Sequence, residues 1–358
     1  MTKEKFQDKC RGSLFGGAVG DALGYPVEFV GSFRNIQAKY GADGITEYDE
    51  CFARLEDPQS RHKALFSDDT QMSLYTAEGL LEAERSDRPA LPMICNAYLA
   101  WFGGQTGRKT KIAYDSELAK IDELNQQRAP GNTCLSALLA IYRGKEPKNS
   151  SKGCGGVMRV APVGIYGASH GWPLEETARM AGDAAELTHL HPLSTYPSAA
   201  LAVMVQLCAS ADETVDAEAF KDIVDKSLKV VSGVYGNDAP AMEDFLRIIR
   251  EAVGLESDGR EDWEIIENDL GGGWVAEETL AIAIFSVLRH MDDFSACMVS
   301  AVNHGGDSDS TGAVAGNIIG AITGYEAIPP KFKEGLQLHD LLLSTADALR
   351  PETNSVCR

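Results

Sequence analysis

The chain has 358 residues, of which 44% are hydrophobic, so it can bury a large core. It carries 53 acidic side chains against 33 Lys and Arg, which gives a formal net charge of −20. Because nucleic-acid binding depends on cations that neutralise phosphates, we expect no DNA or RNA partner. A small phosphorylated ligand is compatible with this charge, since backbone N–H groups and bound metal ions also hold phosphate.

The eight cysteines lie far apart and form no Cys-x-x-Cys pair, which is typical of reduced thiols. Mixed charge follows Met1, where an exported protein would have an apolar signal segment. The apolar stretch 311–323 is shorter than the roughly 20 residues that cross a bilayer, and glycines interrupt it. We therefore expect a cytoplasmic protein without a membrane span.

Helical periodicity dominates the chain, and alternating strand-like segments are nearly absent. The expected helices, in chain order, are 74–85, 92–102, 135–142, 173–187, 198–208, 217–231, 243–253, 276–291 and 294–302. The fold class is therefore all-α, a single compact orthogonal bundle of many helices over residues 1–358. Between about 212 and 269 the composition becomes acidic and less apolar, which indicates either a second domain or a helical elaboration on the surface of one bundle. We favour the elaboration.

Two segments carry glycine at every fourth residue, 12–24 near the start of the chain and 312–324 near its end. Residues four apart share one face of a helix, and glycine on that face allows another backbone to approach closely. Glycine costs about 1 kcal/mol per helical residue, so a repeated pattern calls for a compensating contact. We expect these two helices to pack on each other.

The segment 304–312, His-Gly-Gly-Asp-Ser-Asp-Ser-Thr-Gly, places Asp307 and Asp309 in a turn before a helix. Carboxylates and hydroxyls of this kind suit magnesium, manganese or calcium better than zinc. Helix N-capping by Asp309 or Ser310 is the alternative explanation. An EF-hand is excluded, because the loop would need a bidentate Glu where Ile318 stands.

A second acidic turn, Ser67-Asp68-Asp69-Thr70, precedes the helix expected at 74–85. Capping again explains one carboxylate, but two adjacent carboxylates repel each other unless a cation or hydrogen-bond donors neutralise them. We expect the two acidic turns to converge on a shared metal site. Asp21 and Glu28, near the first glycine helix, form a third and weaker acidic element.

The loop 153–159, Gly-Cys-Gly-Gly-Val-Met-Arg, has few side chains, so its N–H groups could approach a phosphate or ribose. A simple tight turn explains it equally well. His189 and His191 are candidates for hydrogen bonding a ligand, although a lone histidine is more often structural. The chain has neither a His-Glu-x-x-His motif nor a nucleophile elbow, which disfavours covalent catalysis.

Five motifs together resemble the ADP-ribosylglycohydrolase family in order and spacing, over nearly the whole chain. They are Gly-Asp-Ala-Leu-Gly at 20–24, Ser-Asp-Asp-Thr at 67–70, Gly-Cys-Gly-Gly-Val-Met-Arg at 153–159, Leu-Thr-His at 187–189 and Gly-Gly-Asp-Ser-Asp-Ser-Thr at 305–311. The resemblance implies one all-α domain that removes ADP-ribose from modified targets. It also implies a cleft with a binuclear site for two divalent cations, Mg²⁺ or Mn²⁺.

Carried over residue by residue, the resemblance assigns the metal ligands as Ser67, Asp68, Asp69, Asp307, Asp309 and Ser310. It assigns substrate binding to Gly153, Cys154, Gly155, Gly156, Val157, Met158, Arg159 and His189, with Trp274 and Val275 beside the adenosine. The residues assigned to catalysis are Asp68, Asp307, Asp309 and Glu28, among which Glu28, Asp68 and Asp309 remain equal candidates for the acid or base.

The family includes hydrolases of ADP-ribosylarginine, of ADP-ribosylserine and O-acetyl-ADP-ribose, and the enzyme that reactivates dinitrogenase reductase. The segments 128–131 and 305–311, and the His-Pro ending of 187–192, resemble the arginine-specific branch. The expected function is therefore hydrolysis of ADP-ribosylated arginine on protein. Serine-linked or acetyl-linked ADP-ribose, other small ADP-ribosyl substrates, silent ADP-ribose binding and a crystallin-like structural role remain alternatives. The sequence does not indicate an oligomeric state.

Overall fold

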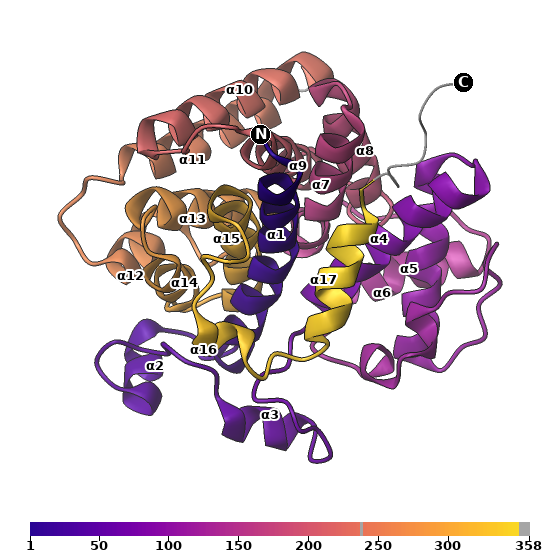
Figure 1. Ribbon diagram of the computed structural model, residues 1–358, viewed down its shortest axis with the longest axis horizontal. Helices are drawn as coiled ribbons and strands as arrows, with labels where there is room; N and C mark the ends of the chain where they lie inside the picture. Colours follow the sequence, from indigo (N-terminus) through magenta and orange to yellow (C-terminus); the bar gives the residue numbers. More distant parts are fainter. Residues whose placement is uncertain (237–238, 351–358) are drawn as a thin grey trace.

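The computed structural model describes residues 1–236 and 239–350, and within these ranges the chain is helical without a β-sheet (Figure 1). Two isolated β-bridges join Ala64 to Leu336 and Gly153 to Val275. The α-helices are α1 (Lys3–Gly24), α2 (Phe33–Tyr40), α3 (Glu50–Glu56), α4 (Asp68–Ser86), α5 (Ala90–Thr106), α6 (Asn132–Tyr142), α7 (Ala161–His170), α8 (Leu174–Glu186), α9 (Pro192–Ser210), α10 (Ala217–Tyr235), α11 (Ala239–Gly254), α12 (Asp262–Ile265), α13 (Ala276–Arg289), α14 (Phe294–Val302), α15 (Ser308–Thr323), α16 (Pro330–Lys333) and α17 (His339–Ala348). Short 3-10 turns are η1 (Tyr25–Val27), η2 (Leu118–Lys120), η3 (Asp122–Asn125) and η4 (Cys154–Arg159), and η5 (Ile266–Leu270) is a π-helix.

The all-α class predicted from periodicity is confirmed, and every expected helix is present. The predicted start of this helix, at residue 74, was wrong. Helix α4 begins at Asp68, so both acids lie in its first turn and Ser67 is the N-cap. The helices α2, α3, α7, α12, α16 and α17 had not been predicted. Residues Ala161 to Gly167 of α7 are all buried, so this helix lacks the polar face that periodicity detects.

The two glycine helices, α1 and α15, pack on each other as predicted, and they lie side by side at the centre of the molecule (Figure 1). They run antiparallel. A Cβ added at Gly12, Gly16 or Gly20 would overlap the carbonyl oxygen of Gly320, Gly316 or Gly312, respectively. This close approach brings the end of α1 to the start of α15, where the acidic residues lie.

Helix α9 lies in the middle of the core, beneath α7, α8, α10 and α13. It is the one helix in the described residues that is long and apolar enough to cross a membrane, and 89% of that apolar window is buried inside the protein. This burial identifies α9 as a core helix. The most span-like segment is therefore this helix, and not the stretch 311–323.

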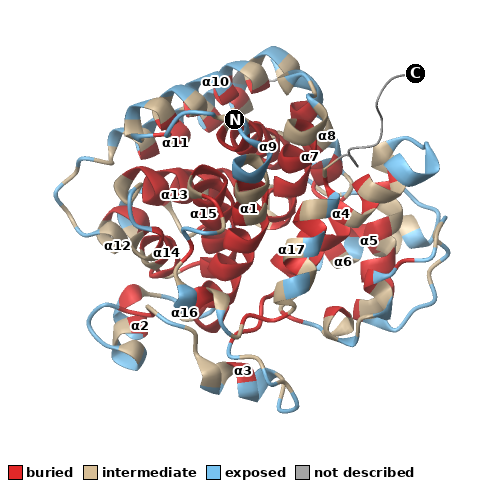
Figure 2. Cartoon of the chain, in the orientation of Figure 1, coloured by how far each residue is buried: buried red, intermediate tan, exposed pale blue. Residues whose placement is uncertain are grey.

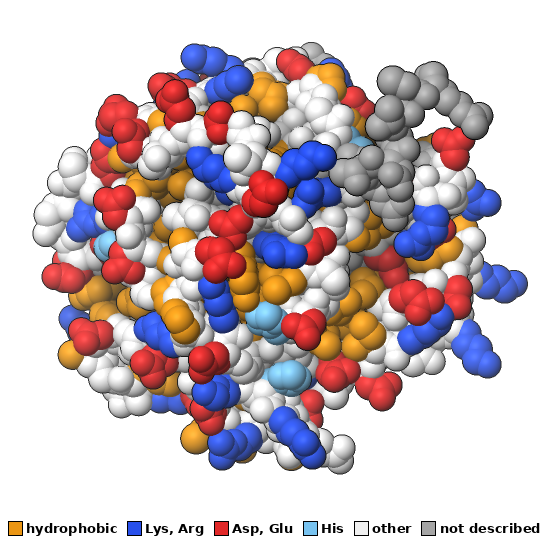
Figure 3. Space-filling model, viewed as in Figure 1, with side chains coloured by type: hydrophobic (Ala, Val, Ile, Leu, Met, Phe, Trp, Pro, Cys, Tyr) orange, Lys and Arg blue, Asp and Glu red, His pale blue; other side chains and the backbone are white. Residues whose placement is uncertain are grey.

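The acidic region from about 212 to 269 forms α10, α11, α12 and η5. Helix α10 packs on α8 and α9, and α11 packs on α9 and α13. The apolar side chains Phe220, Val224, Phe245 and Ile249 are buried in the same core cluster as the central helices. Outer faces of α10 and α11 are exposed (Figure 2), and acidic and basic side chains are mixed over the face drawn in Figure 3.

Candidate metal centre and substrate cleft

The acidic residues meet where three helix ends converge. Asp21 lies in the last turn of α1 and Glu28 follows η1, whereas Asp68 and Asp69 begin α4. Asp307 is the N-cap of α15, and Asp309 lies in its first turn. Helix N-termini present unpaired N–H groups and favour nearby negative charge, so two of the three ends suit an acidic cluster.

Asp21 connects α1 to α4. One of its carboxylate oxygens accepts from the N–H of Ser67 at 2.7 Å, and the other accepts from the N–H and the hydroxyl of Thr70 at 2.9 and 2.5 Å. Burial, followed by the charge of Asp309, raises the pKa of Asp21 to about 7. Both oxygens are occupied, so Asp21 fixes the start of α4 and does not offer a free ligand.

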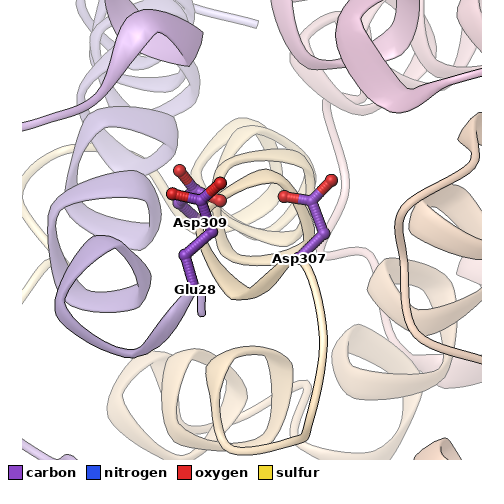
Figure 4. A group of neighbouring side chains, drawn as sticks. All are labelled: Glu28, Asp307 and Asp309. Atoms are coloured by element: carbon purple, nitrogen blue, oxygen red, sulfur yellow. The ribbon is translucent and has the colours of Figure 1, made fainter. Parts of the chain in front are cut away.

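Glu28, Asp307 and Asp309 form a group that could hold a metal ion, with one oxygen from each within 4.8 Å of the other two. Figure 4 shows the carboxylates of Glu28 and Asp309 close together, with Asp307 to one side. Oε2 of Glu28 and Oδ2 of Asp307 are buried and have no hydrogen-bond partner among the described residues. The side chain of Asp307 makes no capping bond, so capping does not explain this acid.

Asp68 and Asp69 complete the cluster from α4. Asp68 accepts from the N–H of Gly131 at 3.2 Å, and Asp69 accepts from the hydroxyl of Ser310 at 2.8 Å. The second bond joins the two acidic turns directly, across 241 residues of chain. The predicted convergence of the two turns is therefore confirmed.

The charge of this cluster is not balanced by protein cations. Within residues 1–236 and 239–350, none of the six acids forms an ion pair with Lys or Arg. Burial, and then the neighbouring acids, raise the pKa of Glu28 to about 12 and that of Asp69 well above its usual value. Burial likewise raises the pKa of Asp68 and Asp307. Buried like charges of this kind require protons or bound cations.

A cleft of ≈ 460 Å³ opens above the acids. Twelve of the predicted site residues line it: Glu28, Asp68, Asp69, Gly153, Cys154, Gly155, Met158, His189, Trp274, Asp307, Asp309 and Ser310. Five predicted residues do not line it, namely Ser67, Gly156, Val157, Arg159 and Val275.

Each of the five has another role in the structure. The hydroxyl of Ser67 caps α4 by accepting from the N–H of Asp69, and Val157 is fully buried in the core. Gly156 packs so closely on Ser194 that a Cβ would overlap its hydroxyl. Val275 forms the bridge to Gly153, which holds the glycine loop beside α13.

Arg159 is the clearest departure from the sequence prediction of direct binding. Its side chain is fully buried behind the cleft wall, where the guanidinium lies 4.3 Å from the ring centroid of Tyr98. It donates to the carbonyl of Ala184 at 3.0 Å and to the hydroxyl of Thr188 at 2.7 Å. Arg159 therefore supports the residues next to His189 instead of reaching the cleft.

Several lining residues were not assigned from the sequence. The segment 129–134 forms one wall, and Phe29 stacks on Trp274 at the mouth, with ring centroids 5.9 Å apart. These two rings are 72% and 46% exposed, which is unusual for large aromatic side chains. Phe29 directly follows Glu28 in the sequence, and an aromatic residue beside a candidate acid is the signal that could have identified this part of the cleft.

Glu267 also went unnoticed, although it holds two parts of the site together. Its Oε1 accepts from the N–H of Phe33 at 2.7 Å and from the N–H of Gly305 at 2.8 Å. The first N–H belongs to the segment after Glu28, and the second to the loop before Asp307. Glu267 lies in the π-helix η5, and a single carboxylate thus fixes both sides of the acidic group.

A family model described as ADP-ribosylglycohydrolase matches residues 2–357. The chain belongs to the ADP-ribosylglycohydrolase family. Among relatives of known name, it is 25% identical to the ADP-ribosyl-[dinitrogen reductase] glycohydrolase of Rhodospirillum rubrum, over 92% of this chain and 90% of that protein. It is 23% identical to the ADP-ribosylarginine hydrolase Tri1 of Serratia proteamaculans, over 96% of this chain and 79% of that protein.

The fold of this ADP-ribosylglycohydrolase family member is shared with a solved structure, the ADP-ribosylglycohydrolase-related protein complex. The TM-score is 0.66 at 24% identity, and the match covers 97% of this chain and 98% of the other. This likeness confirms the all-α architecture. The family assignment, together with the acidic cluster, makes divalent metal binding the first hypothesis for the cleft.

Proposed function

We propose that this protein is a metal-dependent hydrolase that removes ADP-ribose from modified arginine on protein substrates, using two divalent cations, Mg²⁺ or Mn²⁺. The observation that carries the proposal is the buried acidic cluster at the base of the cleft, with free oxygens on Glu28 and Asp307. A silent structural protein has no use for buried acids that repel each other.

The donor set fits a hard divalent cation. Asp68, Asp69, Asp307 and Asp309 offer carboxylate oxygens, which magnesium and manganese prefer. Burial raises the pKa of the nearby Cys154 thiol well above its usual value, so oxygen atoms are the available donors. When bound, such cations stabilise developing negative charge and lower the pKa of a water molecule.

Side chains of the protein supply the remaining functions. Cleaving a glycosidic bond to guanidine requires a proton for the leaving group. Glu28 is best placed to give it, because its buried Oε2 lines the cleft and has no partner among the described residues. By contrast, Asp68 and Asp309 accept from the N–H groups of Gly131 and Ser310.

The arginine linkage is favoured by the resemblance of segments 128–131 and 187–192 to the arginine-specific branch, and by the activity named for the Serratia relative. We propose a cytoplasmic location, which is supported by the absence of disulfides among the seven described cysteines.

The test is a panel of arginine-linked, serine-linked and acetyl-linked ADP-ribose, incubated with the protein and Mg²⁺ or Mn²⁺. We expect release of free ADP-ribose from the arginine linkage at a rate at least tenfold above the others. An Asp307→Asn variant is the matched control, because it keeps the shape of the side chain and removes its charge. A preference for another linkage would redirect the substrate assignment, and retention of bound ADP-ribose without product would indicate a binding protein.

A further inference from the structure

His189 has one ring nitrogen in use and one free. Nδ1 lies 2.8 Å from the hydroxyl of Thr188, whereas Nε2 has no hydrogen-bond partner among the described residues. The side chain is only 2% exposed, yet it lines the cleft. A Cβ added at Gly153 or Gly155 would lie 3.4 or 3.1 Å from Nε2, so this edge of the ring faces the glycine loop. A ring nitrogen that borders the cleft and has no protein partner is free to bond to a ligand.

The proton on His189 can be located by following donors and acceptors. Arg159 can only donate, and it donates to the hydroxyl oxygen of Thr188 at 2.7 Å. The hydroxyl proton of Thr188 must then point to the Ala185 carbonyl at 3.4 Å or to Nδ1 of His189 at 2.8 Å. In the reverse arrangement Nδ1–H donates to Thr188, and the hydroxyl proton has only the 3.4 Å contact with Ala185, beyond the usual O–H···O range of about 2.5–3.0 Å. The distances therefore favour Nδ1 as the acceptor. A neutral imidazole that accepts at Nδ1 carries its proton on Nε2.

The surroundings of His189 favour the neutral form of its imidazole ring. Burial, and then the nearby guanidinium of Arg159, lower the pKa of His189 to about 3. The ring is therefore uncharged at any pH at which the protein would work, and it is unsuited to act as general acid or base near neutrality.

We propose that Arg159 and Thr188 are positioning residues that lock His189 in the Nε2–H tautomer, so that it donates a hydrogen bond to an acceptor oxygen of the ligand in the cleft. The identity of that ligand as ADP-ribose rests on the proposed function, but the tautomer does not. The acceptor is a phosphate oxygen or a ribose hydroxyl, which offer the same chemistry to an N–H donor. Arg159, predicted as a direct ligand, thus acts on the substrate through two other side chains.

The test is ¹⁵N NMR of histidine-labelled protein at pH 8, where the nitrogen shifts distinguish Nε2–H from Nδ1–H. His189→Gln identifies the signal. His304 is the internal reference, because its Nε2 lies 3.1 Å from the carbonyl oxygen of Ala301 and must carry a proton. We expect the Nε2–H form for His189 in the wild type and in Thr188→Ser, which keeps the hydroxyl. In Thr188→Val we expect a mixture of tautomers and about fivefold to tenfold weaker ADP-ribose binding, as for the loss of one hydrogen bond.

Ligand titrations then identify the acceptor. Movement of the His189 Nε2 signal with both ADP and ADP-ribose places the acceptor in the ADP part of the ligand, and movement with ADP-ribose alone places it on the second ribose. An Nδ1–H form in the wild type, or unchanged tautomer and affinity in Thr188→Val, would overturn the proposal, as would an Nε2 signal that neither ligand moves. Absence of hydrolysis with the tautomer and the ligand response intact would count against the proposed function alone.

Discussion

Replacing Gly20 with alanine tests the contact that brings the acidic residues together. The new Cβ would overlap the carbonyl oxygen of Gly312 in α15, and backbone at this position has little freedom to move away. Overpacking of this kind costs about 1–3 kcal/mol. Gly233, in α10, is the matched control, because a Cβ there meets no atom within 4 Å. Both substitutions gain up to about 1 kcal/mol of helix propensity, so the difference between them isolates the cost of packing.

Urea unfolding at equilibrium is the assay. We expect Gly233→Ala to be as stable as the wild type or more stable, and the free energy of unfolding of Gly20→Ala to lie about 1–3 kcal/mol below that of Gly233→Ala. Because Gly20 precedes Asp21 and faces the helix that carries Asp309, Mn²⁺ affinity should fall as well. Equal stability of the two variants would refute the idea that direct backbone contact between α1 and α15 sets the geometry of the site.

Three further predictions concern the cluster itself. Asp307→Asn should lower Mn²⁺ affinity at least tenfold, as measured by calorimetry. It should also raise the melting temperature of the metal-free protein, because it removes one of several buried like charges. An unchanged Mn²⁺ affinity and melting temperature would contradict the metal assignment. The folded-state pKa of Asp21, about 7, lies above its ordinary value of 3.8, so its contribution favours folding at low pH and is lost as pH rises between these values. The metal-free protein should therefore be less stable in urea at pH 8 than at pH 5, and a rise in stability over this range would count against the burial of these acids. Glu267→Ala should destabilise the protein by about 1–3 kcal/mol and weaken Mn²⁺ binding, because it leaves two backbone N–H groups without an acceptor. The control, Glu264→Ala on the same segment, should change neither the stability nor the Mn²⁺ affinity. Equal behaviour of the two variants would refute a positioning role for Glu267.

Regular features of the sequence were enough to predict the framework. Glycine at every fourth residue in 12–24 and 312–324 has few explanations other than close helix packing, and the two segments do pack together. Adjacent acids such as Asp68 and Asp69 likewise indicated a shared site, because their repulsion has to be offset. Repeated glycine lowers helix propensity, and adjacent carboxylates repel each other, so each pattern destabilises the fold on its own. Each pattern therefore indicates that a compensating contact exists.

Roles that depend on distant contacts could not be predicted. A buried Arg159 and an exposed ligand-binding arginine look the same in a sequence, and only the position of Thr188 and Ala184 separates them. Glu267 occurs in a segment rich in acids, where nothing marks it as the acceptor for two N–H groups 234 and 38 residues away. Helix α7 was missed because burial on all sides removes the amphipathic pattern.

Release of ADP-ribose from an ADP-ribosylarginine peptide, before and after metal removal, tests the central claim most directly. Treatment with a chelator should abolish release, and addition of Mg²⁺ or Mn²⁺ in excess should restore it in the wild type but not in Asp307→Asn. Full turnover in metal-depleted buffer, or full activity of Asp307→Asn, would contradict the account.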